Sequence, residues 1–156
     1  MKYVTLIRHA SASWVPGQPD EQRALTENGK QECLSIAKQL KHKAWLPDCI
    51  KVSPALRTQT TANMIIQGLP DTRIETEQTI YEAYYSTLIK MLQNTDNHIE
   101  HICLIGHNPG LSELGSYLSQ GGVNLSPAHA VQFCFEIDTW ANIADNTGKQ
   151  TFLLTP

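Results

Sequence analysis

Arginine and histidine side chains closely follow three apolar, strand-like runs in this sequence of 156 residues. The polar residues after these runs are, in order, Arg8 and His9, Ser53 and Arg57, and His107. Because the carboxyl ends of parallel strands lie at one edge of a sheet, where ligands bind, we expect these side chains to converge. Together with the N-termini of the following helices, they would form a strongly electropositive pocket. Its natural ligand is a phosphoryl group, which arginine binds through two parallel hydrogen bonds.

A histidine is the best candidate for a nucleophile at such a site. No group of Asp and Glu residues with metal-holding spacing lies near these strand ends, and no Asp stands in a recognisable aspartyl-nucleophile motif. Histidine, with an ordinary pKa of about 6.5, is largely neutral at neutral pH, and nearby arginines should lower that pKa further. His9 follows the first strand directly and is the better candidate for the nucleophile. His107 would then donate to a phosphoryl oxygen or stabilise the transition state.

Hydrophobic periodicity and helix-start signals predict the elements that position these residues. Apolar runs predict strands at residues 2–7, 49–52, 73–76, 102–105, 131–137 and 151–154. Helices are expected to begin at Thr26, Ser53-Pro54, Ser86 and Asn108-Pro109, with the three hydroxyl residues as N-caps, and the second helix to run to about Gln67. Strands that alternate with helices and then give way to a hairpin-like end predict an α/β three-layer sandwich. We expect a mostly parallel mixed sheet of about six strands, one antiparallel, flanked by helices in a single domain over residues 1–156.

Composition argues against several classes of partner. The net charge of −3 and the lack of a basic stripe disfavour nonspecific nucleic-acid binding. No stretch approaches the roughly twenty apolar residues of a membrane span, and no signal peptide is apparent. The cysteines have no C-x-x-C spacing and are expected to be reduced; they are Cys33, Cys49, Cys103 and Cys134. We therefore expect a cytoplasmic protein without nucleic-acid or membrane partners, with no cofactor, and monomeric by default.

Four sequence motifs, in the right order along the chain, resemble those of the histidine phosphatase superfamily, whose fold is phosphoglycerate mutase-like. They are Arg8-His9-Ala10; Arg23-Ala24-Leu25-Thr26-Glu27-Asn28-Gly29, with Ala24 in place of the usual proline; Ser53-Pro54-x-x-Arg57-x-x-x-Thr61-Ala62; and Ile105-Gly106-His107-Asn108-Pro109. The short chain leaves no room for a large cap insertion, and Ala10 stands where many members have glycine. Both features resemble the SixA-type branch of small phosphohistidine phosphatases.

The resemblance implies a metal-independent phosphatase in which His9 is phosphorylated transiently. Water would then attack the phosphohistidine and release phosphate. Arg8, Arg57 and His107 would hold the phosphoryl oxygens during both steps.

Glu82 matches the position of the general acid that is usual in this family. Tyr84-Tyr85-Ser86 replaces the G-x-x-E-G that often follows it. An imidazole leaving group protonates far more readily than an alkoxide, so a phosphohistidine substrate needs less from an acid. Asp20 and Arg23, in the loop over residues 10–25, could contact the substrate.

Several functional alternatives stay open at this point. The leading substrate is a phosphohistidine on a protein, and a small phosphoester or phosphoramidate is the runner-up. A non-catalytic module that binds phosphoryl groups is a further alternative. A metal hydrolase that uses His9 and His107 is disfavoured because carboxylate ligands are missing. The other histidines are expected at the surface or at sheet edges; they include His42, His98, His101 and His129.

Overall fold

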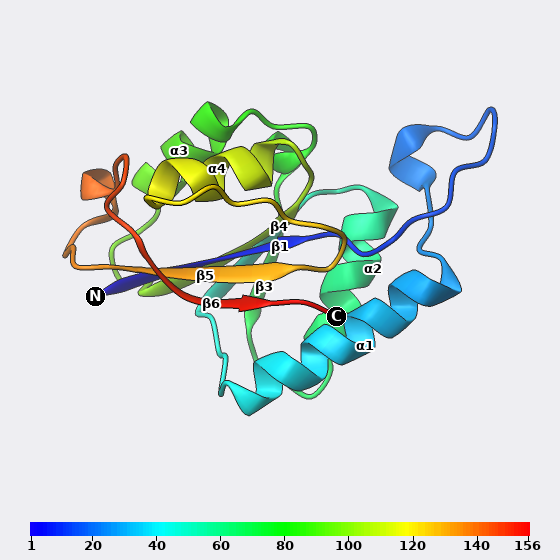
Figure 1. Cartoon of the computed structure of the whole chain (residues 1–156), viewed down its shortest axis with the longest axis horizontal. Coiled ribbons are helices and arrows are strands. Elements are labelled where there is room, and N and C mark those ends of the chain that lie inside the picture. The colour runs from blue at the N-terminus through cyan, green and yellow to red at the C-terminus, as the bar shows by residue number, and fades with distance from the viewer.

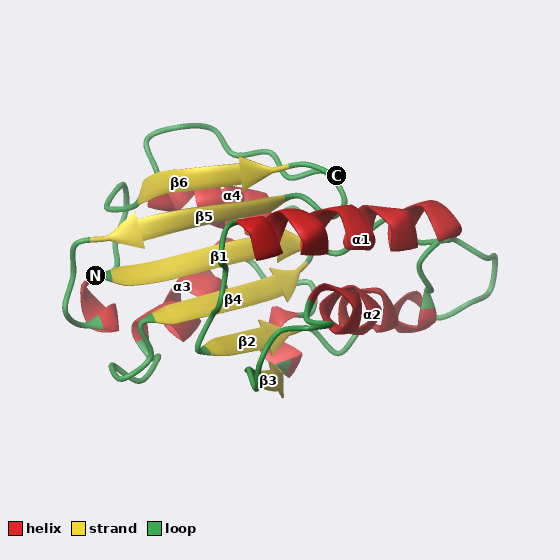
Figure 2. Cartoon of the chain, turned by 90° about the horizontal axis from the view of Figure 1, so that it is seen from below, coloured by secondary structure: helices red, strands yellow, loops and turns green.

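A mixed sheet of six strands runs through the middle of the molecule (Figure 1). The computed structural model describes residues 1–156, and its strands are β1 (Lys2–Arg8), β2 (Cys49–Val52), β3 (Arg73–Thr76), β4 (His101–Gly106), β5 (Ala130–Phe135) and β6 (Lys149–Leu154). Their order across the sheet is β3-β2-β4-β1-β5-β6, which Figure 2 shows from the side of α1 and α2. The first four strands are parallel, and β5 is antiparallel to both of its neighbours. The predicted sheet, mostly parallel with one antiparallel member, is confirmed.

Four helices cover the two faces of this sheet and complete the three layers. They are α1 (Glu27–His42), α2 (Leu56–Ile65), α3 (Tyr85–Gln93) and α4 (Gly110–Leu118). Figure 1 shows α3 and α4 on one face and α1 and α2 on the other. In β1, Val4 and Leu6 belong to one buried apolar cluster and Ile7 to the other. This burial on both faces explains why the first apolar run is nearly continuous in the sequence.

The start of α1 agrees with the sequence. Thr26 is its N-cap, and the Thr26 hydroxyl accepts a hydrogen bond from the Gly29 N–H at 2.9 Å. A Cβ atom at Gly29 would lie 2.1 Å from the Ser11 carbonyl oxygen, so only glycine permits this approach. The contact packs the loop that follows β1 onto the first turn of α1.

The start of α2 differs from the prediction, because Ser53 is not its N-cap. The helix begins at Leu56, after Ala55, whose backbone is extended with φ −59° and ψ 142°. The Ser53 hydroxyl instead lies 2.7 Å from Nε2 of His107. The hydroxyl that the local sequence assigned to capping therefore binds a tertiary partner, and it also accepts from the Ala55 N–H at 3.3 Å. The helix also ends at Ile65, short of the predicted residue 67.

The start of α3 also differs from the prediction. Its N-cap is Tyr84, whose backbone is extended, and Ser86 lies inside the first turn. Tyr84 is the last residue before the helix with an extended backbone, so the hydroxyl signal of Ser86 falls two positions too late. At the other end of the chain, β5 ends at Phe135 and does not reach residue 137.

The strand order brings three strand ends together. β4 lies between β1 and β2, and the pairing continues past the ends of the strands. The His9 N–H donates to the Gly106 carbonyl at 3.1 Å, and the Ser53 N–H donates to the Ile105 carbonyl at 3.2 Å. The residues that follow β1, β2 and β4 are therefore held side by side at the carboxyl edge of the sheet.

The cysteines are free, as predicted, and three of the four are buried. Burial raises the pKa of the Cys33 thiol to about 11, which keeps this thiol protonated. None of the helices has both the length and the apolar character needed to cross a membrane.

Candidate active site

His9 lies just past the end of β1 and is buried, with 8% of its surface exposed. Its Nδ1 lies 2.8 Å from the carbonyl oxygen of Ala10. A carbonyl oxygen only accepts hydrogen bonds, so Nδ1 carries the proton of the neutral ring. Nε2 therefore keeps its lone pair, which is the tautomer that a nucleophilic histidine needs.

Arg8 and Arg57 both present buried donors that no protein atom accepts. Nη1 of Arg8 donates to the Leu125 carbonyl at 3.1 Å, and Nη1 of Arg57 donates to the Asp20 carbonyl at 2.8 Å. The Nε atoms of both arginines are buried and have no hydrogen-bond partner in the protein. An unpaired buried donor costs roughly 1–3 kcal/mol, and more when it is charged. Two such donors near His9 fit an anionic ligand, whose oxygens would accept from them.

His107, just after β4, packs next to His9 with 5.4 Å between the ring centroids. Nη2 of Arg57, which can only donate, lies 3.3 Å from Nδ1 of His107, so Nδ1 is the acceptor. The ring proton is consequently on Nε2, which donates to the Ser53 hydroxyl at 2.7 Å. Both ring nitrogens have protein partners, and the ring supports the guanidinium of Arg57. Donation from His107 to a phosphoryl oxygen stays a prediction.

Both histidines are neutral at pH 7. Burial is the largest cause that lowers the pKa of His9 from 6.5 to about 4, and the charges of Arg57, Arg8 and Arg23 lower it further. Burial, followed by the charge of Arg57, lowers the pKa of His107 to about 3. The site thus combines a neutral imidazole, whose lone pair is free, with fixed positive charges.

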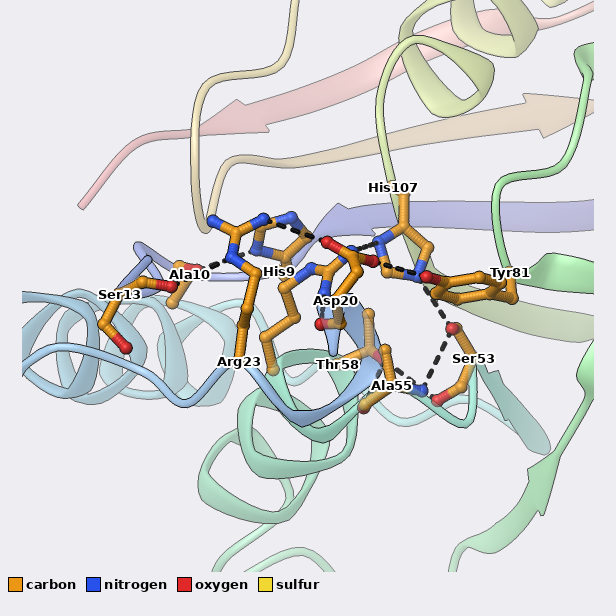
Figure 3. Close-up of polar contacts among 11 residues, drawn as sticks. His9, Ala10, Ser13, Asp20, Arg23, Ser53, Ala55, Thr58, Tyr81 and His107 are labelled. Atoms are coloured by element: carbon orange, nitrogen blue, oxygen red, sulfur yellow. Dashed lines mark hydrogen bonds and ion pairs between the residues drawn. The ribbon is translucent and has the colours of Figure 1, made fainter. Parts of the chain in front are cut away.

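The loop between β1 and α1 brings Asp20 into an ion pair with Arg57, and Figure 3 shows Asp20 among the side chains of Arg23, Tyr81 and His107. Nη2 of Arg57 donates to Oδ2 of Asp20 at 2.9 Å, and Nη1 of Arg23 donates to Oδ1 at 3.3 Å. The Tyr81 hydroxyl also donates to Oδ2. The Tyr81 hydrogen bond, together with those from the two arginines, lowers the pKa of Asp20 to about 2. Burial and the Asp20 carboxylate raise the pKa of Tyr81 to about 12, so neither group titrates near neutral pH.

Glu82 lies beside this cluster. The residue is exposed, its φ of 50° is in the left-handed region, and its carboxylate makes no hydrogen bond or ion pair. It lines a pocket of about 270 Å³ together with His107 and Glu113. Glu82 is therefore close enough to serve a leaving group only if that group extends into this pocket, and its role as an acid stays a prediction.

The convergence of the predicted arginines and histidines is thus observed, with Asp20 and Arg23 beside them. Sequence reasoning missed two partners: Ser53 as the residue that holds His107, and Tyr81 as the residue that holds Asp20. Tyr81 adjoins Glu82 in the sequence, but no local signal connects it with a residue 61 positions away. No group of three or more His, Cys, Asp or Glu side chains is arranged to hold a metal ion.

The fold and this cluster together define an α/β protein with histidines and unpaired arginine donors at the carboxyl edge of its sheet. A family model described as the histidine phosphatase superfamily (branch 1) matches residues 4–102, and the chain belongs to this superfamily.

Similar proteins agree with this assignment. An uncharacterized chloroplastic protein of Arabidopsis thaliana is 29% identical over 138 residues, which is 80% of this chain; the chain spans only 62% of that protein's length. The SixA protein from Nakamurella multipartitia has a TM-score of 0.86 and 18% identity, over 99% of this chain and 96% of that one. SixA from Agrobacterium tumefaciens has a TM-score of 0.83 and 23% identity, over 99% of both chains. At these identities the structural likeness establishes the fold, which has no large cap.

Proposed function

We propose that this protein hydrolyses phosphoryl groups through a covalent phosphohistidine on His9, and that its leading substrate is a phosphohistidine on a protein. The observation that carries the proposal is the state of His9, neutral and with a free Nε2, between arginines whose Nε donors lack a partner. A solved protein histidine phosphatase SixA with tungstate, an oxyanion, shares the fold at a TM-score of 0.83 and 21% identity, over 98% of this chain and 96% of that one.

In the first step, Nε2 of His9 attacks the phosphorus atom. A new N–P bond forms while the bond from phosphorus to the leaving group breaks, and the leaving group takes a proton. The Nδ1 proton of His9 stays on the ring, where it donates to the Ala10 carbonyl. The Nε groups of Arg8 and Arg57 would neutralise the charge on the phosphoryl oxygens, because they are already in place and lose no hydrogen bond on doing so.

In the second step, water attacks the phosphorus atom and the N–P bond breaks. Inorganic phosphate leaves, and His9 returns to the neutral tautomer with the proton on Nδ1. This return favours repeated turnover because the pKa of about 4 keeps His9 unprotonated at neutral pH. His107 and Ser53 would keep Arg57 in one position through both steps.

The leaving group needs a proton source, and neither Asp20 nor Tyr81 provides one. Asp20 and Tyr81 do not change charge near neutral pH, because their pKa values are about 2 and about 12. An imidazole leaving group, which is a weak base rather than an alkoxide, can take its proton from water or from the exposed Glu82. This favours phosphohistidine over a small alkyl phosphoester, which remains the alternative substrate.

A single experiment decides between a covalent phosphatase and a non-catalytic phosphoryl-binding protein. The protein is mixed with a radiolabelled phosphoryl donor and quenched in alkali, and the label is tested for loss in acid, which identifies a phosphohistidine. We expect an acid-labile adduct in the wild type and none in His9→Ala. No adduct in the wild type, or an adduct that persists in His9→Ala, would contradict the proposal. Full activity in the presence of a chelator would exclude the metal hydrolase.

A further inference from the structure

The carboxylate of Asp20 lies among the arginines at the mouth of the site. Asp20 is the acidic residue that forms ion pairs there, with Arg57 and with Arg23. The Asp20 side chain is 41% exposed, whereas that of Arg57 is 6% exposed. The carboxylate is therefore the solvent-facing member of this ion pair, and Figure 3 shows Asp20 with Arg23 and Tyr81 around it.

Asp20 is held in this position from several directions. Its carbonyl accepts from Arg57 at 2.8 Å, and its two carboxylate oxygens accept from Arg57, Arg23 and Tyr81. These donors come from α2, from the loop itself and from the segment before α3. They keep the carboxylate ionised over the whole range in which His9 is neutral, because they hold the pKa of Asp20 at about 2. Asp20 is thus a permanent negative charge at a fixed place.

The leaving group of a substrate would lie next to the carboxylate of Asp20. In an in-line displacement the leaving group departs on the side of phosphorus opposite to the attacking atom, here Nε2 of His9. His9, Arg57 and His107 are each more than nine-tenths buried. The rest of a substrate therefore extends from the phosphoryl group toward solvent, where Asp20 lies.

We infer that Asp20 makes the site select substrates by the charge of their leaving group. The site admits phosphoryl compounds whose leaving group is neutral or positively charged, such as a nitrogen-linked phosphoryl group on imidazole, and disfavours those that carry a carboxylate close to the phosphoryl group. This inference rests on the proposed function and makes Asp20 its specificity-determining residue. Two negative charges about 5 Å apart in a partly hydrated mouth change binding roughly fourfold to fifteenfold.

A matched substrate series tests this selection. Phenyl phosphate, 3-carboxyphenyl phosphate and 3-(aminomethyl)phenyl phosphate differ in the charge of the leaving group and little in its size. We expect kcat/KM of the wild type to be lowest for the carboxylate and highest for the amine, with the neutral compound between them. Asp20→Asn should reduce the differences within the series to about twofold, because it removes the charge and keeps one acceptor oxygen. The neutral compound measures any general loss of activity in the variant.

Glu21→Gln is the matched control. Glu21 lies next to Asp20 in the same 3-10 turn, is exposed, and makes no hydrogen bond or ion pair in the site. This variant removes the same charge from the same loop and should leave the selectivity of the wild type unchanged. Raising the salt concentration should weaken the selectivity of the wild type, since charges in an exposed mouth are screened.

The outcomes separate this inference from the proposed function. Non-hydrolysable phenylphosphonate and its 3-carboxy analogue report the same selectivity as dissociation constants, without turnover. Two results together would overturn the role of Asp20. In Asp20→Asn, kcat/KM would change by the same factor for all three phosphates, and salt would not alter the selectivity of the wild type. If Asp20→Asn does not fold, the salt dependence and the phosphonate pair in the wild type decide alone. Absence of a phosphoenzyme on His9 would instead overturn the proposed function, whatever the phosphonates show.

Discussion

Two regions of this molecule contain buried or partly buried histidines, and both are built on the same two strands. At the carboxyl ends of β1 and β4 lie His9 and His107. Earlier along these strands lie Thr5, in β1, and His101, the first residue of β4. Nε2 of His101 is 2.8 Å from the Thr5 hydroxyl, which also accepts from Nε1 of Trp45 at 2.9 Å. Burial lowers the pKa of His101 to about 4, the same value as for His9.

The difference between the two regions lies in the groups around the histidines. His101 lies in a hydrogen-bond network centred on Thr5. The Thr5 hydroxyl hydrogen-bonds to the side chains of His101, Trp45 and Gln132. Around His9 stand arginines that have buried Nε donors without a partner. A lowered histidine pKa therefore marks burial, while unpaired cationic donors mark a place prepared for an anion.

The largest expected difference between the regions is in catalysis. His9→Ala should lower kcat/KM by roughly a thousandfold or more, because it removes the proposed nucleophile. His101→Gln should leave kcat/KM within about threefold of the wild type, because His101 belongs to the region without arginines. Both are measured on the same phosphohistidine substrate after circular dichroism confirms folding. Equal losses in the two variants would abolish the distinction drawn here.

Arg57 tests whether cationic donors set the two regions apart. Arg57→Ala should lower kcat/KM by roughly 100- to 1000-fold and weaken phosphate binding, because it removes a preorganised donor and leaves Asp20 without its main partner. Arg57→Lys should restore only a small part of the lost kcat/KM, since the lysine ammonium group lacks the planar, two-pronged donor geometry of a guanidinium. Arg73→Ala is the control, because this arginine lies on β3 with its side chain 61% exposed and paired with Glu75. Phosphate titration by calorimetry should separate Arg57→Ala from this control.

Thr5 should show the reverse behaviour, with a loss of stability and no loss of activity. Thr5→Val removes the fully buried hydroxyl on which Trp45 and His101 depend, and should lower the free energy of unfolding by roughly 1–3 kcal/mol. The same change at the exposed Thr151 should cost less than about 0.5 kcal/mol. Urea unfolding with kcat/KM measured in parallel checks both expectations; a marked loss of activity in folded Thr5→Val would contradict them.

Glu82 should have a smaller effect, which depends on the leaving group. Glu82→Gln should change kcat/KM for a phosphohistidine substrate by less than about threefold, and for an alkyl phosphoester by roughly tenfold or more. The reason is that imidazole leaves more easily than an alkoxide without help from an acid. Equal losses on both substrates would mean that Glu82 does not act as the acid.

The histidines of both regions should remain neutral near neutral pH. His9, His107 and His101 have lowered pKa values in the folded protein, so their rings should not titrate by NMR between pH 5.5 and 8. The unfolded chain binds more protons than the folded one from about pH 6.5 downward. Their contribution to stability is therefore fully present above pH 6.5 and is lost as the pH falls toward 4. Replacing His101 by Gln should reduce this slope by up to about 1.4 kcal/mol per pH unit.

The layers and most strands were predictable because they depend on local patterns. β2 and β3 have the predicted bounds, and α1 begins after Thr26, because short runs with β-branched residues and a capping hydroxyl leave direct traces in nearby residues. Ser53 and Ser86 carry the same local signal as Thr26 and did not cap their helices. For Ser53 the reason is His107, a partner 54 positions away that no local rule includes.

By itself, the sequence determined that an arginine and a histidine end the first strand and that further arginine and histidine residues follow two later strands. The physical reason is that parallel strands must place their carboxyl ends at one edge, so the positions of these residues along the chain imply their convergence. Only the tertiary structure decided the tautomer of His9, the pairing of His107 with Ser53, and the place of Asp20 over Arg57. The last two depend on hydrogen bonds between distant segments, and the first on the conformation that brings Nδ1 of His9 to the carbonyl of its neighbour Ala10. Together with burial, these contacts set the charge and the free lone pair that the proposed chemistry uses.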